Sequence, residues 1–431
     1  MIERPPSLGA NQARTCGLLY ACAALATVVA CGGGEQTIID PPPVASSGFT
    51  LSVRADPADA SVTAELGWAT GVPGAVVVIS PVDSSAPPRS LVTGATGEVT
   101  IPDLPAGKYF VSARRVFTNL ELQALAQVTD AAGFAGEGGI DVSPTLTVGS
   151  IQIPASRRRS LLISEWSFNS RNIPGSGTYH FGGYLELYNN SDSTIYLDGV
   201  LIAHAWSQLG DWPGYPCVTS EPFRNDPAGL WAQKIATFPG SGRDFPLMPG
   251  DNVVVATDAV DHRDLFPGMI DLRDADFEFL GSADVDNPAV PNMLDVSTEA
   301  PPFGHGLIFP ASFEVVVGVA EAADARSLLR RTSPRGEDYL RLPSAGLLDV
   351  FASATTYLLT LTPPRAFCSE MLPPSIDRMH GFFFNEDSNE WQVSVSRKAL
   401  TQAPNGQVIL QNTRTSANDY YRTPRTPGVV K

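Results

Sequence analysis

Acidic side chains gather in one segment of the sequence, between residues 271 and 295. They are Asp271, Asp274, Asp276, Glu278, Asp284, Asp286 and Asp295. In an extended chain Asp274, Asp276 and Glu278 would share one face, because successive side chains alternate. Calcium takes about six to eight oxygen ligands, and Asp284 and Asp286 are the candidate metal ligands. The segment lacks the glycine and distal glutamate of an EF-hand loop, so a solvated acidic loop is the alternative.

A second candidate site is an aromatic-rich stretch between residues 204 and 243. Its large rings, set among glycines and prolines, are Trp206, Trp212, Tyr215, Phe223, Trp231 and Phe238. Aromatic rings give a large contact area at low entropic cost. We therefore take as candidate ligand contacts Trp206, Trp212, Tyr215 and Trp231. The alternative is a small satellite core that holds a long loop in place.

The sequence contains no complete catalytic motif. It has no His-Glu-x-x-His pair, no Gly-x-Ser-x-Gly elbow and no phosphate-binding loop ending in Gly-Lys-Ser/Thr. The five histidines stand singly, and a lone histidine is more often a packing residue than a ligand or base. We predict no catalytic residues, no enzymatic activity and no cofactor other than the calcium ion considered above. A hydrolase with a site divided between distant segments is the alternative.

The first 30 residues have the organisation of an export signal. Arg4 and Arg14 precede an apolar run at 18–30, which is shorter than the roughly 20 residues needed to cross a bilayer. The run ends in Val-Val-Ala-Cys, which resembles the lipobox of bacterial lipoproteins. The resemblance implies cleavage before Cys31, lipid on its thiol and a place at the cell outer membrane; an ordinary secretory signal is the alternative. Residues 31–47, rich in glycine and then proline, are predicted to be a tether.

Two cysteines remain beyond the predicted signal and anchor, Cys217 and Cys368. An even pair in an oxidising compartment predicts one disulfide. It would close a loop of about 150 residues and constrain the unfolded chain. Two separate buried thiols are the alternative, since spacing alone cannot place the two residues together.

The formal net charge of −16 restricts the partners. It argues against nucleic acid, which is bound by neutralising phosphates, and against electrostatic binding to an anionic membrane. Arg157, Arg158 and Arg159 form a basic run, which we interpret as a solvated linker between two domains. The stretch Gly-Glu-Gly-Gly at 136–139 is interpreted as a flexible turn, because it lacks the spacing and the following acidic residue of a dinucleotide-binding loop.

The composition predicts a mainly β protein. The chain of 431 residues has 43% hydrophobic residues, 38 glycines and 37 prolines, which favours many turns and short strands. We predict tandem β-sandwich domains of the immunoglobulin-like or transthyretin-like kind, with a few short inserted helices. The segments with the best helical patterns are 119–128 and 321–331. Residues 184–188 and 195–197 are predicted to pair as a hairpin in a half-buried sheet.

The first predicted domain covers residues 48–154. An apolar run at 74–79 is followed by T-G-A-T-G-E-V-T-I at 93–101 and L-P-A-G-K-Y-F-V at 104–111. This order resembles the carboxypeptidase regulatory-like (transthyretin-like) β-sandwich. The resemblance implies a spacer or docking module.

The second predicted domain covers residues 160–431. It contains I-S-E at 163–165, Y-L-E-L-Y-N at 184–189, Y-L-D-G at 196–199 and a Pro-Gly turn into a valine-rich strand at 249–256. These steps resemble the lamin-tail immunoglobulin-like sandwich.

Five further stretches resemble the bacterial lipoproteins grouped as domain of unknown function 4876. They lie at 258–262, 270–278, 284–292, 347–349 and 415–419, and the resemblance spans residues 48–431. It implies a partner of an outer-membrane uptake receptor of the TonB-dependent type. We therefore predict a membrane-anchored, non-enzymatic binding or accessory subunit; a structural or adhesive envelope protein is the alternative. A binder needs an exposed, ordered aromatic or acidic cleft, whereas a spacer does not.

Overall fold

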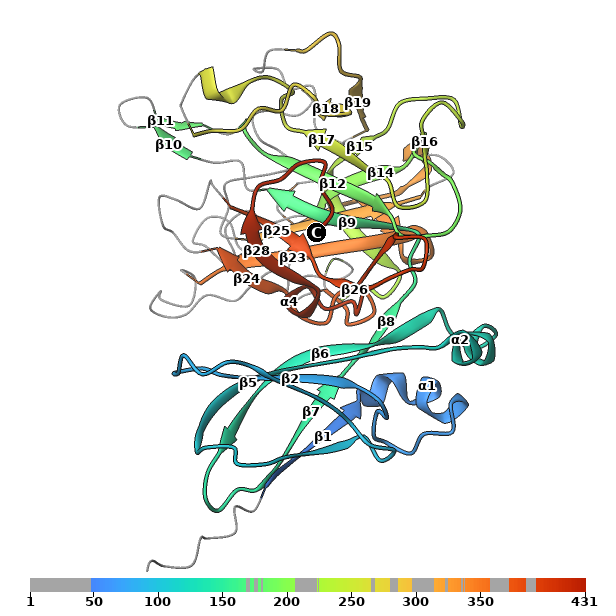
Figure 1. The fold of residues 1–431 in the computed structure, drawn as a ribbon. Helices are drawn as coiled ribbons and strands as arrows, with labels where there is room; N and C mark the ends of the chain where they lie inside the picture. Colours follow the sequence, from blue (N-terminus) through green and yellow to red (C-terminus); the bar gives the residue numbers. More distant parts are fainter. Residues whose placement is uncertain are drawn as a thin grey trace, which may run out of the picture. The chain divides into compact units, whose positions relative to one another are not determined.

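Alternating apolar side chains build two small sheets from residues 48–157 of the computed structural model (Figure 1). Their strands are β1 (Phe49–Ala55), β2 (Val76–Pro81), β3 (Arg89–Val92), β4 (Glu98–Ile101), β5 (Gly107–Val116), β6 (Ala131–Val142), β7 (Val148–Ile153) and β8 (Ala155–Arg157). One sheet has the order β4-β1-β7 and the other β3-β2-β5-β6-β8. Leu51, Val77, Val111 and Ile153 are among the residues of their shared core.

The structure describes most of the chain after residue 47. The described residues are 48–167, 171–173, 177–179, 181–205, 223, 225–264, 268–279, 286–296, 314–321, 325–334, 336, 338–356, 372–384 and 393–431. Residues Ser47–Lys431 form one compact unit. Among the described residues, no helix has the length and apolar character needed to cross a membrane.

A 14-stranded sheet dominates residues 161–424. Its strands are β9 (Leu161–Ser167), β12 (Tyr184–Asn189), β14 (Leu201–Ala205), β15 (Gly229–Thr237), β17 (Asn252–Ala256), β18 (Phe277–Phe279), β19 (Asn292–Asp295), β20 (Glu314–Ala320), β21 (Leu329–Thr332), β22 (Asp338–Pro343), β23 (Leu347–Thr355), β24 (Gly381–Phe384), β25 (Val393–Arg397) and β28 (Tyr420–Pro424). Smaller pairs are β10 (Arg171–Ile173) with β11 (Gly177–Tyr179), β13 (Ile195–Tyr196) with β16 (Pro246–Leu247), and β26 (Ala399–Gln402) with β27 (Val408–Leu410).

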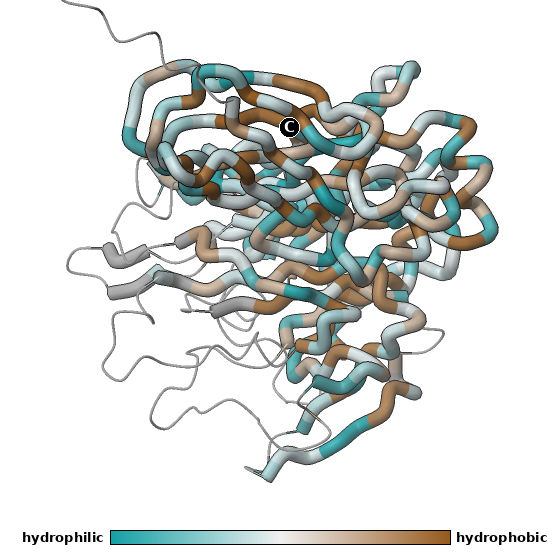
Figure 2. The backbone as a smooth tube through the Cα atoms, turned by 90° about the horizontal axis from the view of Figure 1, so that it is seen from below, coloured by the Kyte–Doolittle hydropathy of each residue, from teal (hydrophilic) through white to brown (hydrophobic). Residues whose placement is uncertain are grey.

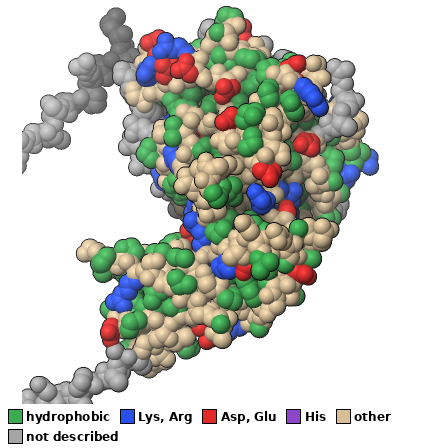
Figure 3. Space-filling model, turned by 45° about the vertical axis from the view of Figure 1, so that its right-hand side comes forward, with side chains coloured by type: hydrophobic (Ala, Val, Ile, Leu, Met, Phe, Trp, Pro, Cys, Tyr) green, Lys and Arg blue, Asp and Glu red, His purple; other side chains and the backbone are tan. Residues whose placement is uncertain are grey.

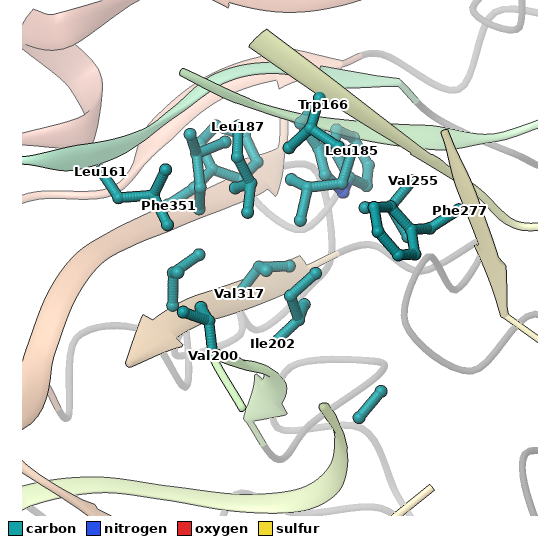
Figure 4. Packing of buried hydrophobic residues seen from close by; sticks show 14 of the residues in the cluster. Leu161, Trp166, Leu185, Leu187, Val200, Ile202, Val255, Phe277, Val317 and Phe351 are labelled. Carbon is teal, nitrogen blue, oxygen red and sulfur yellow. The ribbon is translucent and has the colours of Figure 1, made fainter. Parts of the chain in front are cut away.

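The large sheet folds over one hydrophobic core, so that its two halves face each other. Leu185 and Val255 come from strands β12 and β17, while Ile202 and Val317 come from β14 and β20, and all four belong to one buried cluster (Figure 4). In Figure 2 hydrophobic and hydrophilic segments follow each other closely along the chain, as short strands with two different faces require. The prediction of a mainly β protein built from sandwich-type layers is confirmed.

The helices are few and short. They are η1 (Pro57–Asp59), α1 (Ala60–Glu65), α2 (Asn119–Leu125), η2 (His262–Asp264), η3 (Ala325–Ser327), η4 (Ser344–Gly346) and α4 (Ser416–Asp419). Helix α2 lies where the sequence predicted one, and a capping box between Thr118 and Glu121 fixes its start.

The helix predicted at 321–331 is wrong for the part that the structure describes. A single 3-10 turn, η3, is followed by strand β21, which pairs with β22. A turn that contains Ser333, Pro334 and Gly336 joins the two strands, and Gly336 has a φ of +86°. Strand pairing across this turn outweighs the helical propensity of the preceding residues.

The hairpin predicted between 184–188 and 195–197 is also wrong. Strand β12 pairs with β9 and β17, and β13 pairs with β16. Both faces of β12 are buried, including Glu186, whose carboxylate accepts hydrogen bonds from Ser164 Oγ (2.7 Å) and Gly428 N (2.8 Å). The polar alternation of the sequence therefore reflects an internal hydrogen-bond network and not a solvated face.

The glycine-rich stretch at 136–139 lies inside strand β6, where it pairs with β5, and is not a flexible turn. A Cβ atom at Gly136 would lie 2.7 Å from Ile153 Cγ2, and one at Gly138 would lie 3.2 Å from Ile151 Cγ2. The glycines thus let strand β7 pack closely against β6.

Candidate functional site

Trp231, a predicted ligand contact, is a packing residue in strand β15. Its side chain is 1% exposed, its ring lies edge-on to Phe223 at 5.0 Å between centroids, and its Nε1 donates to Asp226 Oδ2 (2.9 Å). The guanidinium of Arg341 lies over the ring at 5.7 Å. The prediction of a ligand-contacting face is therefore wrong for this residue, and the satellite-core alternative describes it. The other three candidates, Trp206, Trp212 and Tyr215, lie outside the described residues.

The described carboxylates of the acidic segment act at separate positions and do not converge on one point. Glu278 is buried and accepts from Ala259 N (2.8 Å) and Asn287 N (2.9 Å), and Asp276 accepts from Val254 N (2.8 Å). Asp271 forms ion pairs with Arg263 and Arg273. These carboxylates therefore hold turns together.

Asp286 is exposed, and its Oδ1 accepts from Asn292 Nδ2 (2.8 Å). Asp284 lies outside the described residues, which contain no group of three histidine, cysteine, aspartate or glutamate side chains placed to hold a metal ion. The predicted calcium site and the predicted anchor and disulfide depend on undescribed residues, namely Asp284, Cys31, Cys217 and Cys368.

Three histidines lie in the described part of the chain, and all are largely buried. Burial, reinforced by the charge of Lys234, lowers the pKa of His204 to about 3. Burial also lowers the pKa values of His262 and His380 to about 4. Each is neutral near pH 7, which makes it a poor proton exchanger there.

His262 joins hairpin β10–β11 to the body of the sheet. Its Nε2 lies 3.0 Å from the carbonyl oxygen of Asp258, which can only accept, so Nε2 carries the proton. Its Nδ1 then accepts from the Tyr179 hydroxyl at 2.6 Å. Burial, with the charge of Asp258, raises the pKa of Tyr179. This hydroxyl therefore keeps its proton, and the hydrogen bond between Tyr179 and His262 has a structural role.

A cleft of about 210 Å³ lies beside strand β23, and we call it the arginine cleft. The residues of its lining that bear on binding are Arg159, Leu347, Ser375, Ile376, Asn412 and Arg414. Arg159 follows strand β8, whereas Asn412 and Arg414 lie between β27 and α4.

Backbone hydrogen bonds bring these distant segments together. Arg157 N donates to Asn412 O (2.8 Å), and Asn412 N donates to Ser156 Oγ (3.0 Å). Arg414 has a φ of +55°, and its N–H donates to Asn412 Oδ1 (3.2 Å). Its Nη1 donates to Ser375 O at 3.5 Å. The position of the Arg414 side chain thus depends on an unusual backbone conformation that local hydrogen bonds support.

The cleft carries more positive charge than its carboxylate neighbours neutralise. Arg157 is paired with Asp59 (2.8 Å) and Asp130 (2.9 Å), whereas Arg159 reaches Asp130 only at 3.8 Å. Burial lowers the pKa of Arg414 to about 10, and repulsion by Arg159 and Arg157 adds to this. The guanidinium remains protonated at neutral pH.

The described lining of the cleft also includes a carboxylate, that of Asp349. Its Oδ2 accepts from Ile163 N (2.8 Å) and from the buried guanidinium of Arg397. The negative charge is thus compensated from inside the protein, and Arg159 and Arg414 dominate the opening.

A second cavity, of about 280 Å³, lies between the β2–β3 and β4–β5 connections. Its polar side chains serve the surrounding turns. Tyr109 OH donates to Pro105 O (2.9 Å), and Arg89 donates to Pro102 O (2.7 Å) and Asp103 O (3.2 Å). This cavity is the weaker candidate because these groups are already bonded.

Arg414 was missed by sequence reasoning, and the basic run at 157–159 was interpreted as a solvated linker. That interpretation is wrong for Arg157, which belongs to strand β8 and forms ion pairs with Asp59 and Asp130. Three arginines in an acidic chain were the available signal. Their partner loop at 412–414 carries no motif.

Comparison with solved structures identifies a protein of similar fold. No family model matches the chain, and no curated protein does. A crystal structure of a DUF4876 family protein from Bacteroides thetaiotaomicron is similar, with a TM-score of 0.50 and 16% identity over 89% of this chain and 96% of that chain. The chain therefore shares the fold of a protein from the family that its sequence resembles.

Two other structures are much less similar. The 5-hydroxyisourate hydrolase of Klebsiella pneumoniae has a TM-score of 0.15 and 17% identity, over 26% of this chain and 91% of the hydrolase. A proposed adhesin from Bacteroides ovatus has a TM-score of 0.18 and 9% identity, over 75% of this chain and 91% of that one. Neither likeness is close enough to support an inference about this chain.

Proposed function

We propose that this chain is an exported lipoprotein of the cell envelope that acts as a non-enzymatic binding or accessory subunit. The observation that carries the proposal is the arginine cleft, an ordered opening with two guanidinium groups, Arg159 and Arg414. A binding protein needs an ordered opening of this kind, whereas a spacer does not. The sequence led us to expect an aromatic or acidic cleft, and the cleft that we propose is basic.

The membrane anchor in this proposal rests on the sequence. The basic residues, the apolar run and the Val-Val-Ala-Cys ending of residues 1–31 support lipidation at Cys31. A single lipid-modified cysteine followed by a tether would hold the folded part near the membrane without crossing it.

Metabolic labelling with a fatty acid tests the anchor. The full chain should incorporate the label, and the Cys31→Ser variant should not, whereas the Cys22→Ser variant should label like the wild type. Equal labelling of wild type and Cys31→Ser would contradict lipidation at this residue.

An outer-membrane uptake receptor of the TonB-dependent type is the partner that we propose. Affinity capture of the lipidated chain from its native membrane, followed by mass spectrometry, should recover a β-barrel receptor in a fixed ratio. Recovery of the chain alone, together with unchanged nutrient uptake in a deletion strain, would favour a structural or adhesive role instead.

A further inference from the structure

We propose that the arginine cleft binds a small organic anion, with its charged group at Arg159 and Arg414 and its apolar part against the apolar residues of the lining. The inference rests on the proposed binding function and names the ligand class. Carboxylates and phosphate monoesters share the required chemistry, a compact anionic group with several acceptor oxygens.

Among the described residues of the lining, Arg159 and Arg414 supply donors, and the Asp349 carboxylate is already paired with Arg397. Within the described part of the chain, Arg159 forms one ion pair, with Asp130 at 3.8 Å, which is too long for a hydrogen bond, and Arg414 donates through Nη1 to Ser375 O at 3.5 Å. Both guanidinium groups therefore keep donors for a ligand. A planar guanidinium can meet a carboxylate or phosphate with two parallel hydrogen bonds.

Asn412 adds a neutral amide to the lining. Its Oδ1 accepts from Arg414 N, so its Nδ2 group is the part of the amide that can donate to a ligand. The residue is 3% exposed and lines the cleft. A donor held beside two cations favours an acceptor-rich anion.

Apolar residues supply about half of the lining. They are Leu347, Leu348, Val350, Ile376 and Pro227. Val350 and Ile376 are 8% and 7% exposed, so this part of the lining is firmly packed into the protein. Inorganic phosphate would leave these apolar residues uncovered, whereas an organic anion would bury them.

The size and electrostatics of the cleft limit the ligand further. A volume of about 210 Å³ is below the range of about 300–1,000 Å³ that is usual for drug-sized ligands. The chain as a whole carries a net charge of −16, so distant charges repel an anion. Salt at 0.1 M largely screens charges that are more than about 10 Å apart, so the repulsion by distant carboxylates is weak. Binding therefore depends on the nearby arginines.

Calorimetric titration of the full chain with phenyl phosphate and with inorganic phosphate tests this inference. Phenyl phosphate should bind at one site and more tightly than inorganic phosphate. The substitutions Arg159→Gln and Arg414→Gln should each weaken phenyl phosphate binding about tenfold or more. Arg158→Gln is the matched control, since Arg158 is an exposed neighbour outside the cleft lining, and it should bind like the wild type.

Thermal unfolding of each variant without ligand separates lost binding from lost folding, and a phenyl phosphate-induced rise in Tm gives a second readout. Absence of saturable binding to the wild type, or equal weakening by Arg158→Gln, would overturn the inference. Binding only to vesicles that contain phosphatidylglycerol would assign a lipid headgroup and overturn the small-ligand form. Capture of a receptor by the Arg159→Gln chain would show that the accessory role is independent of the cleft.

Discussion

Arg397 is a fully buried cation that joins several segments of the large sheet. Its Nε donates to Ile163 O (2.8 Å), and its Nη1 donates to Gln411 O (3.0 Å). Its Nη2 donates to the Asp349 carboxylate and to the Tyr420 hydroxyl. A buried charge is tolerated only when its donors are satisfied in this way.

We expect Arg397→Met to lower the free energy of unfolding by about 3–5 kcal/mol, because the substitution leaves the buried Asp349 carboxylate without its cation. Urea unfolding measures this change. Arg330→Met is the control, since Arg330 is 58% exposed and its ion pair with Asp338 should contribute less than about 1 kcal/mol. Similar losses in both variants would show that the buried position has no special role.

His204 should make stability depend on pH. Its pKa is about 3 in the folded chain, below the ordinary value of 6.5, so the unfolded chain binds its proton first as the pH falls. The contribution to stability is therefore complete above pH 6.5, is lost progressively as the pH falls, and is gone below about pH 3. Between pH 7 and pH 5 the loss should be about 2 kcal/mol.

His204→Leu should remove this dependence. Buried carboxyl groups whose pKa values are raised, such as Asp377, act in the opposite direction but are common to both chains. The difference between wild type and variant, measured by urea unfolding at pH 7 and pH 5, therefore isolates the histidine. Parallel pH profiles would contradict the assignment.

At the scale of elements, the start of helix α2 could be predicted from neighbouring residues, whereas the partners of strand β12 could not. The capping box at Thr118 and Glu121 was readable from neighbouring residues, and helix α2 begins there. Strand partners are set by distant segments, so β12 could not be placed between β9 and β17 from its own alternation. The glycines of β6 were misread for the same reason, since the strand that packs on them is β7.

We expect Gly136→Ala to destabilise the first pair of sheets by about 1–3 kcal/mol, because its Cβ would lie 2.7 Å from Ile153 Cγ2 and 3.1 Å from Ile153 Cα. Gly139→Ala is the matched control in the same strand, where the nearest atom, Tyr109 O, would be 4.0 Å away. Thermal and urea unfolding should separate the two variants. Equal stability would mean that the close approach of β7 to β6 can relax without cost.

At the scale of the whole molecule, the sequence predicted the β-rich class and the likeness to domain of unknown function 4876, since composition and short motifs carry both. It did not predict the arginine cleft. Ser156 and Asn412 are 256 residues apart in the chain, yet a hydrogen bond joins the segments that carry Arg159 and Arg414. No spacing rule reaches such a distance. Acidic and basic side chains are also interspersed over the face seen in Figure 3. The net charge of −16 therefore could not indicate a local basic site.

Asp59 connects the first pair of sheets to the rest of the compact unit. It is 1% exposed, accepts from Ala155 N (2.9 Å) and pairs with Arg157 (2.8 Å) and Arg378 (3.6 Å). Arg378 also pairs with Asp56 at 3.1 Å. Because Arg378 lies between strands β23 and β24, these ion pairs join segments of the two sheet systems.

We expect Asp59→Asn to lower the free energy of unfolding by about 3 kcal/mol, because the two arginines lose their shared buried carboxylate. Loosening should be local to this junction, so hydrogen exchange measured by mass spectrometry should rise in peptides from 48–157 before it rises in the large sheet. Asp141→Asn, at an exposed position of β6, should leave both regions as protected as in the wild type. A uniform rise in exchange across both regions would show that Asp59 stabilises the unit globally and does not act at the junction.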